Sequence, residues 1–161
     1  MVTTTPFGSG DLAAPTSRSL VQVPGQALTM STEDFGEHIA DVDGPLTAML
    51  RRSAQAMSTQ LARDAACNRV HSVRQRAARW LLMTADRMNS PSFDLTPYFL
   101  AQMLAVRRTS VSEVAQSLAE DGCLTYTRGR ITITDRPRLQ SHACNCYEAI
   151  RRATEAALAA R

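Results

Sequence analysis

The stretch from Thr96 to Gly122 constrains the fold more than any other, because its apolar residues repeat twice at helical spacing. The first set is Leu100, Ala101 and Leu104. The second set is Val111, Val114, Ala115 and Leu118, at i, i+3, i+4 and i+7 on one helix face. A short helix, a turn of about three or four residues and a second helix make a helix-turn-helix.

The polar face of the second predicted helix carries side chains that can contact bases or phosphates. It contains Thr109, Ser112, Glu113 and Gln116, and Arg107 and Arg108 stand at its beginning. In a helix-turn-helix of this type, the second helix enters the major groove of DNA. DNA binding is therefore the first hypothesis.

Two alternating segments follow this motif. Asp121-Gly122 is a helix stop. Residues 123–126 and 130–134 alternate in polarity, and the Gly-containing residues 127–129 lie between them. The pattern predicts a β-hairpin, which in this position is the wing of a winged helix.

The charge distribution also favours a polyanionic partner. All 18 basic residues are Arg, and the net charge is +3. Before Pro45, Arg18 stands against six acidic residues, whereas Arg dominates from Cys67 onward. A basic C-terminal part is typical of proteins that bind nucleic acid.

A long helix is predicted from Pro45 to about Cys67, with no internal Gly or Pro. Its narrow apolar stripe resembles a coiled-coil seam. The stripe consists of Leu46, Leu50, Met57 and Leu61. We expect this helix to form a homodimer; packing on its own domain is the alternative.

The next predicted helix runs from Val70 to Met88, and Asn89-Ser90-Pro91 ends it. We expect its inner face to include Val70, and we assign Arg69, Arg74 and Arg76 to a solvated face. Thr96 is the predicted N-cap of the following helix, with Pro97 at N1. An Ala-rich helix is expected between Arg138 and Arg161.

The N-terminal part offers weaker signals. Residues 1–20 are rich in Thr, Ser, Pro and Gly, which predicts a disordered leader. Leu20–Met30 contains two short strand-like pieces around Pro24-Gly25. Ser31 to Phe35 predicts a short capped helix.

From Cys67 to Tyr147, the segments CNRVHSVRQRAARWLL, LTPYFLAQMLAVRRTSVSEVAQSL and TYTRGRITITD resemble bacterial regulators of the Crp/Fnr family, as does the later Cys-x-Cys-Tyr. The resemblance spans roughly residues 20–150. It implies a mainly α protein, in which a long dimerisation helix precedes a winged helix-turn-helix that binds a palindromic operator. It also implies RNA polymerase as a possible partner.

The chain departs from this family in two places. Residues 1–44 resemble a leader and a short remnant of the effector-binding β-barrel, without the Gly-Glu phosphate cassette. Binding of a cyclic nucleotide is therefore not expected, and Arg18 is not assigned as a ligand. Ala105 stands where the family usually has Gly, at a position expected to need positive φ, which costs Ala roughly 1 kcal/mol.

The resulting domain prediction is a dimerisation helix at 45–67, a DNA-binding domain at 68–140 and a helical tail at 141–161. The predicted DNA contacts are Arg107, Arg108, Thr109, Ser110, Ser112, Glu113, Arg128 and Arg130. By the resemblance, Arg108 reaches base edges and Ser110 contacts the DNA backbone. Arg128 and Arg130 are expected on phosphates. Alternatively, Ser110 and Glu113 have capping-box spacing and cap the helix start.

Sulfur and imidazole groups leave a second hypothesis open. Cys67-x3-His71 and His142-x-Cys144-x-Cys146 would supply ligands for zinc or an iron–sulfur cluster if the fold brought them together. The spacing matches no standard finger or ferredoxin pattern, and the family's oxygen sensors carry their cluster cysteines near the N-terminus. We therefore expect thiols without a metal or other cofactor, and a metal- or redox-sensing regulator is the alternative.

Other classes of protein are less compatible with the sequence. Catalytic motifs such as Gly-x-Ser-x-Gly, Walker and His-Glu-x-x-His do not occur, so an enzyme is not expected. Neither a secretion signal nor a membrane span is recognised, and a cytoplasmic location is expected. An interaction-only protein that is truncated and heterodimerises with an intact relative through residues 45–67 remains an alternative.

Overall fold

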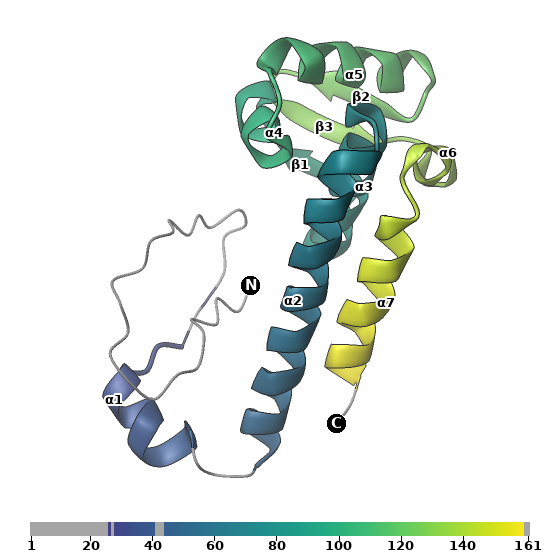
Figure 1. Cartoon of the computed structure of the whole chain (residues 1–161). Helices are drawn as coiled ribbons and strands as arrows, with labels where there is room; N and C mark the ends of the chain where they lie inside the picture. The colour runs from purple at the N-terminus through teal and green to yellow at the C-terminus, as the bar shows by residue number, and fades with distance from the viewer. Residues whose placement is uncertain (1–25, 27, 41–43, 160–161) are drawn as a thin grey trace. The chain divides into compact units, whose positions relative to one another are not determined.

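The structure, a computed structural model, describes residues 26, 28–40 and 44–159 and is mainly helical (Figure 1). It divides into two compact units. One comprises Thr59–Arg152, and the other comprises Met1–Ser58 with Ala153–Arg161. The Thr59–Arg152 unit confirms the predicted fold class, a mainly α winged helix-turn-helix.

Two short helical segments precede the long helix. The helix α1 spans Thr32–Phe35, and the π-helix η1 spans Gly36–Ala40. The Ser31 hydroxyl accepts a hydrogen bond from the amide of Asp34 at 2.9 Å, which confirms the predicted cap. Residues 26 and 28–30 are not in a strand. The rest of the predicted leader and of the strand-like pieces, residues 1–25 and 27, lies outside the described residues.

The predicted long helix is present as α2, Pro45–Val70, and ends three residues later than expected. The following helix, α3, begins at Val73 rather than Val70 and ends at Met88. Ser72 caps it in a capping box with Gln75, and this cap separates the two helices. Val70, expected to face inward, is 69% exposed.

Helix α3 forms the centre of the Thr59–Arg152 unit, since it packs against α4, α5, α6 and β1. Leu81 and Leu82 are fully buried. Arg76 and Arg79 are buried too, with 7% and 6% of their surface exposed. The solvated-face prediction is therefore wrong for Arg76, because its guanidinium donates to Asn68 Oδ1 at 2.6 Å and to the Leu104 carbonyl oxygen at 3.1 Å.

The predicted helix-turn-helix is present as α4, Pro97–Leu104, and α5, Arg108–Glu120 (Figure 1). The Thr96 hydroxyl accepts from the Phe99 amide at 3.2 Å, and Pro97 opens the helix as expected. Val111 and Leu118 are buried on the inner face of α5. The two helices pack against each other, and α5 also packs on β2.

A three-stranded antiparallel sheet completes the winged fold, in the order β1-β3-β2. The predicted hairpin is β2, Leu124–Thr127, and β3, Arg130–Ile133. Thr127 pairs with Arg130, which leaves Arg128 and Gly129 as a two-residue turn. The sequence did not predict β1, Ser92–Asp94, which pairs with β3 from Ser92↔Thr132 to Asp94↔Arg130.

The C-terminal part forms two helices rather than the expected single helix. They are α6, Arg136–His142, and α7, Cys146–Ala159. Tyr147 is buried, and its hydroxyl donates to Asp86 Oδ2 at 2.8 Å and accepts from Arg136 Nη2 at 2.7 Å. This network joins the first turn of α7 to α3 and α6, so the core of the unit continues past the hairpin.

Candidate nucleic-acid interface

The outward face of α5 is where most of the predicted DNA contacts lie. Arg107, Arg108, Thr109, Ser112 and Glu113 are all exposed at the beginning of this helix. Ser112 donates from its hydroxyl to the carbonyl oxygen of Arg108 at 3.2 Å, one turn earlier. The opposite face carries the buried Val111 and Leu118, so α5 presents a continuous polar surface.

Ser110 differs from its neighbours because it is half-buried. The alternative in which Ser110 and Glu113 form a capping box is wrong. The helix begins at Arg108, with Arg107 as its N-cap, and therefore Ser110 already lies within the first turn. Neither side chain is used to begin the helix.

The first turn of α5 is basic, which is unusual for a helix start. Within the described chain, Arg107 makes no side-chain cap hydrogen bond, and the first turn of α5 contains no acidic residue. The N-terminus of a helix carries partial positive charge and favours Ser, Thr, Asp or Asn at the cap. Arg107 and Arg108 therefore lower the stability of this helix start.

The turn before α5 has the predicted left-handed geometry. Ala105 has φ 51° and ψ 49°. Its amide donates to the Gln102 carbonyl oxygen at 3.2 Å, and the Val106 amide donates to that of Ala101 at 3.1 Å. These hydrogen bonds provide donors for two carbonyl groups in the last turn of α4, and they set the direction in which α5 begins.

The wing carries a second exposed basic group. Arg128 has φ 49° and Gly129 has φ 83°, the combination that a type I′ turn requires. An Arg at positive φ is strained, because its Cβ crowds the backbone there. Arg130 Nε donates to Asp94 Oδ1 at 2.9 Å, and this hydrogen bond raises the pKa of the Arg130 guanidinium.

The three arginines assigned to a solvated face have different surroundings. Arg69 is exposed, as expected. Arg74 forms an ion pair with Asp121 and donates to the Ser117 hydroxyl, so it joins α3 to the end of α5. Arg76 is buried. Periodicity alone placed Arg74 and Arg76 wrongly because their partners belong to other helices.

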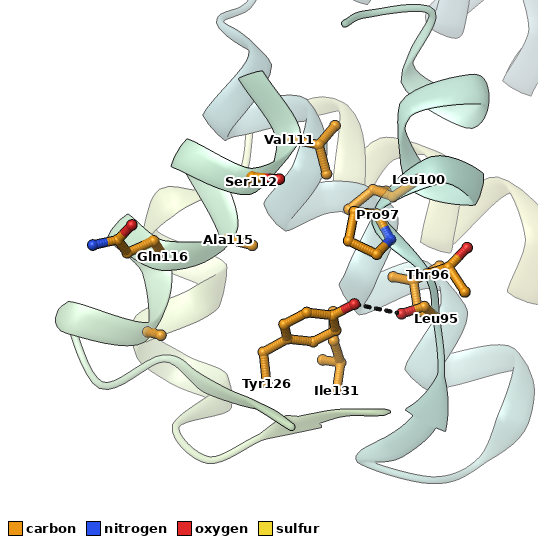
Figure 2. A pocket seen from close by; sticks show the side chains of 11 residues that line it. Leu95, Thr96, Pro97, Leu100, Val111, Ser112, Ala115, Gln116, Tyr126 and Ile131 are labelled. Carbon is orange, nitrogen blue, oxygen red and sulfur yellow. Dashed lines mark hydrogen bonds between the residues drawn. The ribbon is translucent and has the colours of Figure 1, made fainter. Parts of the chain in front are cut away.

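A cavity of about 260 Å³ lies between α5 and the sheet, lined mainly by apolar atoms of Leu100, Val111, Ala115 and Ile131 (Figure 2). Tyr126 stands at its edge and donates from its hydroxyl to the Leu95 carbonyl oxygen at 3.3 Å, the dashed line in Figure 2. This bond ties the wing strand β2 to the segment that precedes α4.

The structure brings together four of the five sulfur and imidazole residues raised by the sequence. One ligand atom from each of Cys67, His71, Cys144 and Cys146 lies within 4.8 Å of every other. His142 is outside this group, since its Nε2 lies 3.3 Å from Asp121 Oδ2.

The paired helices α4 and α5, the hairpin and its exposed arginines define a winged helix-turn-helix domain. Residues 75–142 match the family model of the Crp-like helix-turn-helix domain, so this part of the chain is a Crp-like helix-turn-helix domain. Among the described residues, no helix is long and apolar enough to cross a membrane.

The solved structures that are similar to the chain include the following two. One is described as a transcriptional regulator of the Crp/Fnr family from Eubacterium rectale, with 21% identity and a TM-score of 0.51; the match covers 68% of this chain and 48% of that one. The other is the catabolite activator protein of Thermus thermophilus, with 26% identity, a TM-score of 0.43 and coverage of 61% and 44%. The chain thus spans less than half of each solved relative. No curated protein sequence matches it.

Proposed function

We propose that the chain is a sequence-specific transcription regulator that binds DNA as a homodimer in the cytoplasm. The observation that carries the proposal is the basic, exposed first turn of α5. Arg107 and Arg108 weaken that helix start, and their position is explained if they contact the DNA. Helix α5 would enter the major groove, and the wing would lie along the backbone.

The proposed contacts differ in what they read. Arg108 donates two hydrogen bonds to a guanine, an interaction worth about 1–3 kcal/mol of discrimination. Thr109, Ser112 and Glu113 contact bases or phosphates from the same face, and the half-buried Ser110 contacts the backbone. Arg107, Arg128 and Arg130 neutralise phosphates, which adds affinity without sequence preference.

The proposed dimer rests on apolar side chains of α2. Leu46 is 45% exposed and Leu61 is 63% exposed, while Leu50 and Met57 are half-buried. Burying such side chains against a second copy removes apolar surface from water. Two copies related by two-fold symmetry would then read two half-sites separated by one turn of DNA or a multiple.

A fluorescence-anisotropy titration against promoter fragments at several salt concentrations tests DNA binding. The expected result is a preference for particular fragments and a linear fall of log K with log salt concentration. Binding without any sequence preference, or without salt dependence, would overturn the proposal.

The exposed apolar residues of α2 also favour the interaction-only alternative. Sedimentation at micromolar concentration, combined with the DNA titration, distinguishes this alternative from the DNA-binding homodimer. A dimer that binds DNA supports the proposed function. A dimer without DNA affinity supports the interaction-only protein, and a monomer that binds DNA tightly refutes the role of residues 45–67. Addition of RNA polymerase to the DNA complex tests that partner.

A further inference from the structure

A buried group of thiols and one imidazole lies in the Thr59–Arg152 unit, among residues that the proposed DNA contacts do not use. This sulfur cluster consists of Cys67, His71, Cys144 and Cys146. Cys67 has no exposed surface, Cys144 and Cys146 are 4% and 8% exposed, and His71 is half-buried. Four potential metal ligands therefore meet inside the fold.

The ligand atoms of the sulfur cluster all lie within 4.8 Å of one another, close enough to surround a single ion. The Sγ atoms of Cys67 and Cys144 lie 3.5 Å apart. His71 Nδ1 lies 3.3 Å from Cys67 Sγ and 3.9 Å from Cys146 Sγ. With zinc–sulfur bonds of about 2.3 Å and zinc–nitrogen bonds of about 2.0–2.1 Å, a tetrahedron has edges of roughly 3.5–3.8 Å.

We propose that Cys67, His71, Cys144 and Cys146 bind one zinc ion in a closed tetrahedral site. Three thiolates and one imidazole are a ligand set of structural zinc, and soft thiolates disfavour magnesium and calcium. An iron–sulfur cluster fits less well, because its ligands bind different iron atoms and stand farther apart than the ligands of one ion. The burial of the three cysteines makes the site structural rather than catalytic.

Local structure explains how the chain presents these ligands. Cys67 lies in the last turn of α2, and His71 directly follows the helix, four positions after Cys67, so their side chains share a face. The helical bond from the His71 amide to the Cys67 carbonyl oxygen, 3.1 Å, holds this turn. Cys146 begins α7, and the Tyr147 amide donates to the Cys144 carbonyl oxygen at 3.0 Å. A helix N-terminus stabilises thiolates.

The charges around the sulfur cluster are compatible with a bound cation and three thiolates. Burial raises the pKa of Cys67 to about 12 and also raises the pKa of Cys146. On binding, each thiol releases its proton to solvent as its sulfur bonds to zinc. The neutral imidazole leaves the site with a net charge of −1. Arg79, buried and ion-paired with Asp64, lowers the pKa of both thiols by its charge.

A zinc ion in this place would fasten the end of α2 to the beginning of α7, next to the capped start of α3. Metal binding to the folded chain adds directly to the free energy of unfolding. This role is independent of the proposed DNA binding, because none of the four ligands is a proposed DNA contact.

The test uses the full chain without an affinity tag, purified under reducing conditions from zinc-containing medium. Elemental analysis should find one zinc ion per chain, and cobalt substitution should give the visible absorption of a tetrahedral thiolate site. His71→Asn and Cys144→Ala should each lower zinc affinity by more than about 100-fold. The matched controls His142→Asn and Cys123→Ala, which change a histidine and a buried cysteine outside the cluster, should keep the metal.

A metal chelator should lower the Tm of the wild-type chain and of the controls but leave the Tm of His71→Asn unchanged. The half-buried His71 makes this variant the one expected to keep its fold, which circular dichroism checks. Wild-type chain that takes up no zinc, or cluster variants that retain as much as the controls, would overturn the proposal.

Discussion

The guanidinium of Arg76 donates from Nη1 to the carbonyl oxygen of Leu104 at 3.1 Å, and so joins α3 to the last residue of α4. The same Nη1 donates to Asn68 Oδ1 at 2.6 Å. Leu104 immediately precedes Ala105, where the chain turns toward α5. A buried charge beneath the turn therefore fixes the point from which the proposed recognition helix begins.

Replacing this arginine should be costly. Arg76→Met keeps much of the side-chain volume but removes two charge-assisted hydrogen bonds and leaves the Leu104 carbonyl oxygen without this donor. We expect the free energy of unfolding to fall by about 2–4 kcal/mol. Urea unfolding measures the change, and Arg69→Met, at an exposed position, is the control. A loss no larger than that of the control would show that Arg76 does not hold the turn.

Arg76 also illustrates where sequence patterns stop being informative. Helical periodicity assigns a residue to a face, but partners that are distant in sequence decide whether an arginine on that face is solvated. For Arg76 these partners are Asn68 and Leu104; for Arg74 they are Ser117 and Asp121. The proposed DNA contacts on α5 were more predictable, because their exposure follows from the apolar residues of the same helix.

The strand β1 and the break between α6 and α7 were missed for a similar reason. Three residues, Ser92–Asp94, are too few to show alternation, and they become a strand only by pairing with β3. The separation of the C-terminal helices at residues 143–145 carries neither Gly nor Pro. The sulfur cluster joins ligands that are far apart in sequence: His71 and Cys146 are 75 positions apart, and Cys67 and Cys144 are 77 apart. Only the fold could bring them together.

Ala105 offers a test of turn strain. Its φ of 51° lies in the region that costs a residue with Cβ roughly 1 kcal/mol, whereas Gly adopts it freely. Ala105→Gly should therefore raise the free energy of unfolding by about 0.5–1 kcal/mol. The control is Ala119→Gly, inside α5, which should lower it by about 1 kcal/mol. Destabilisation by both variants would mean that the turn is not strained in the native chain.

The division of roles between helix and wing can be measured on DNA. Arg108→Ala should reduce the preference for the best fragment over a scrambled one, by about 1–3 kcal/mol. Arg130→Ala should weaken binding to both fragments alike and reduce the slope of log K against log salt by about 1. Anisotropy titrations with both fragments distinguish these effects. If both variants reduce the preference for the best fragment over the scrambled one by the same amount, the proposal that α5 contacts bases and the wing contacts phosphates is wrong.

Asp94 gives a complementary prediction for the wing. Its carboxylate pairs with Arg130, and both side chains are largely exposed, at 79% and 62%. Asp94→Asn removes a negative charge beside a proposed phosphate contact while the amide retains an acceptor. Affinity for all DNA sequences should rise a few-fold at low salt, and the gain should shrink as salt screens it. An affinity unchanged at low salt would show that the wing stays away from the DNA.

Arg107 should show a direct conflict between stability and binding. It occupies the N-cap of α5, where Ser, Asp or Thr would accept a hydrogen bond from an amide of the first turn. Arg107→Ser should raise the free energy of unfolding by about 1 kcal/mol, and it should weaken DNA binding on the order of tenfold because a phosphate loses its cation. Arg107→Lys is the matched control, since it keeps the charge and supplies no cap; both quantities should stay near those of the wild type. Urea unfolding and anisotropy titrations of the same preparations measure the two effects. If Arg107→Ser is more stable and binds DNA as tightly as before, the basic helix start has no role in DNA recognition and the main support for the proposed function is lost.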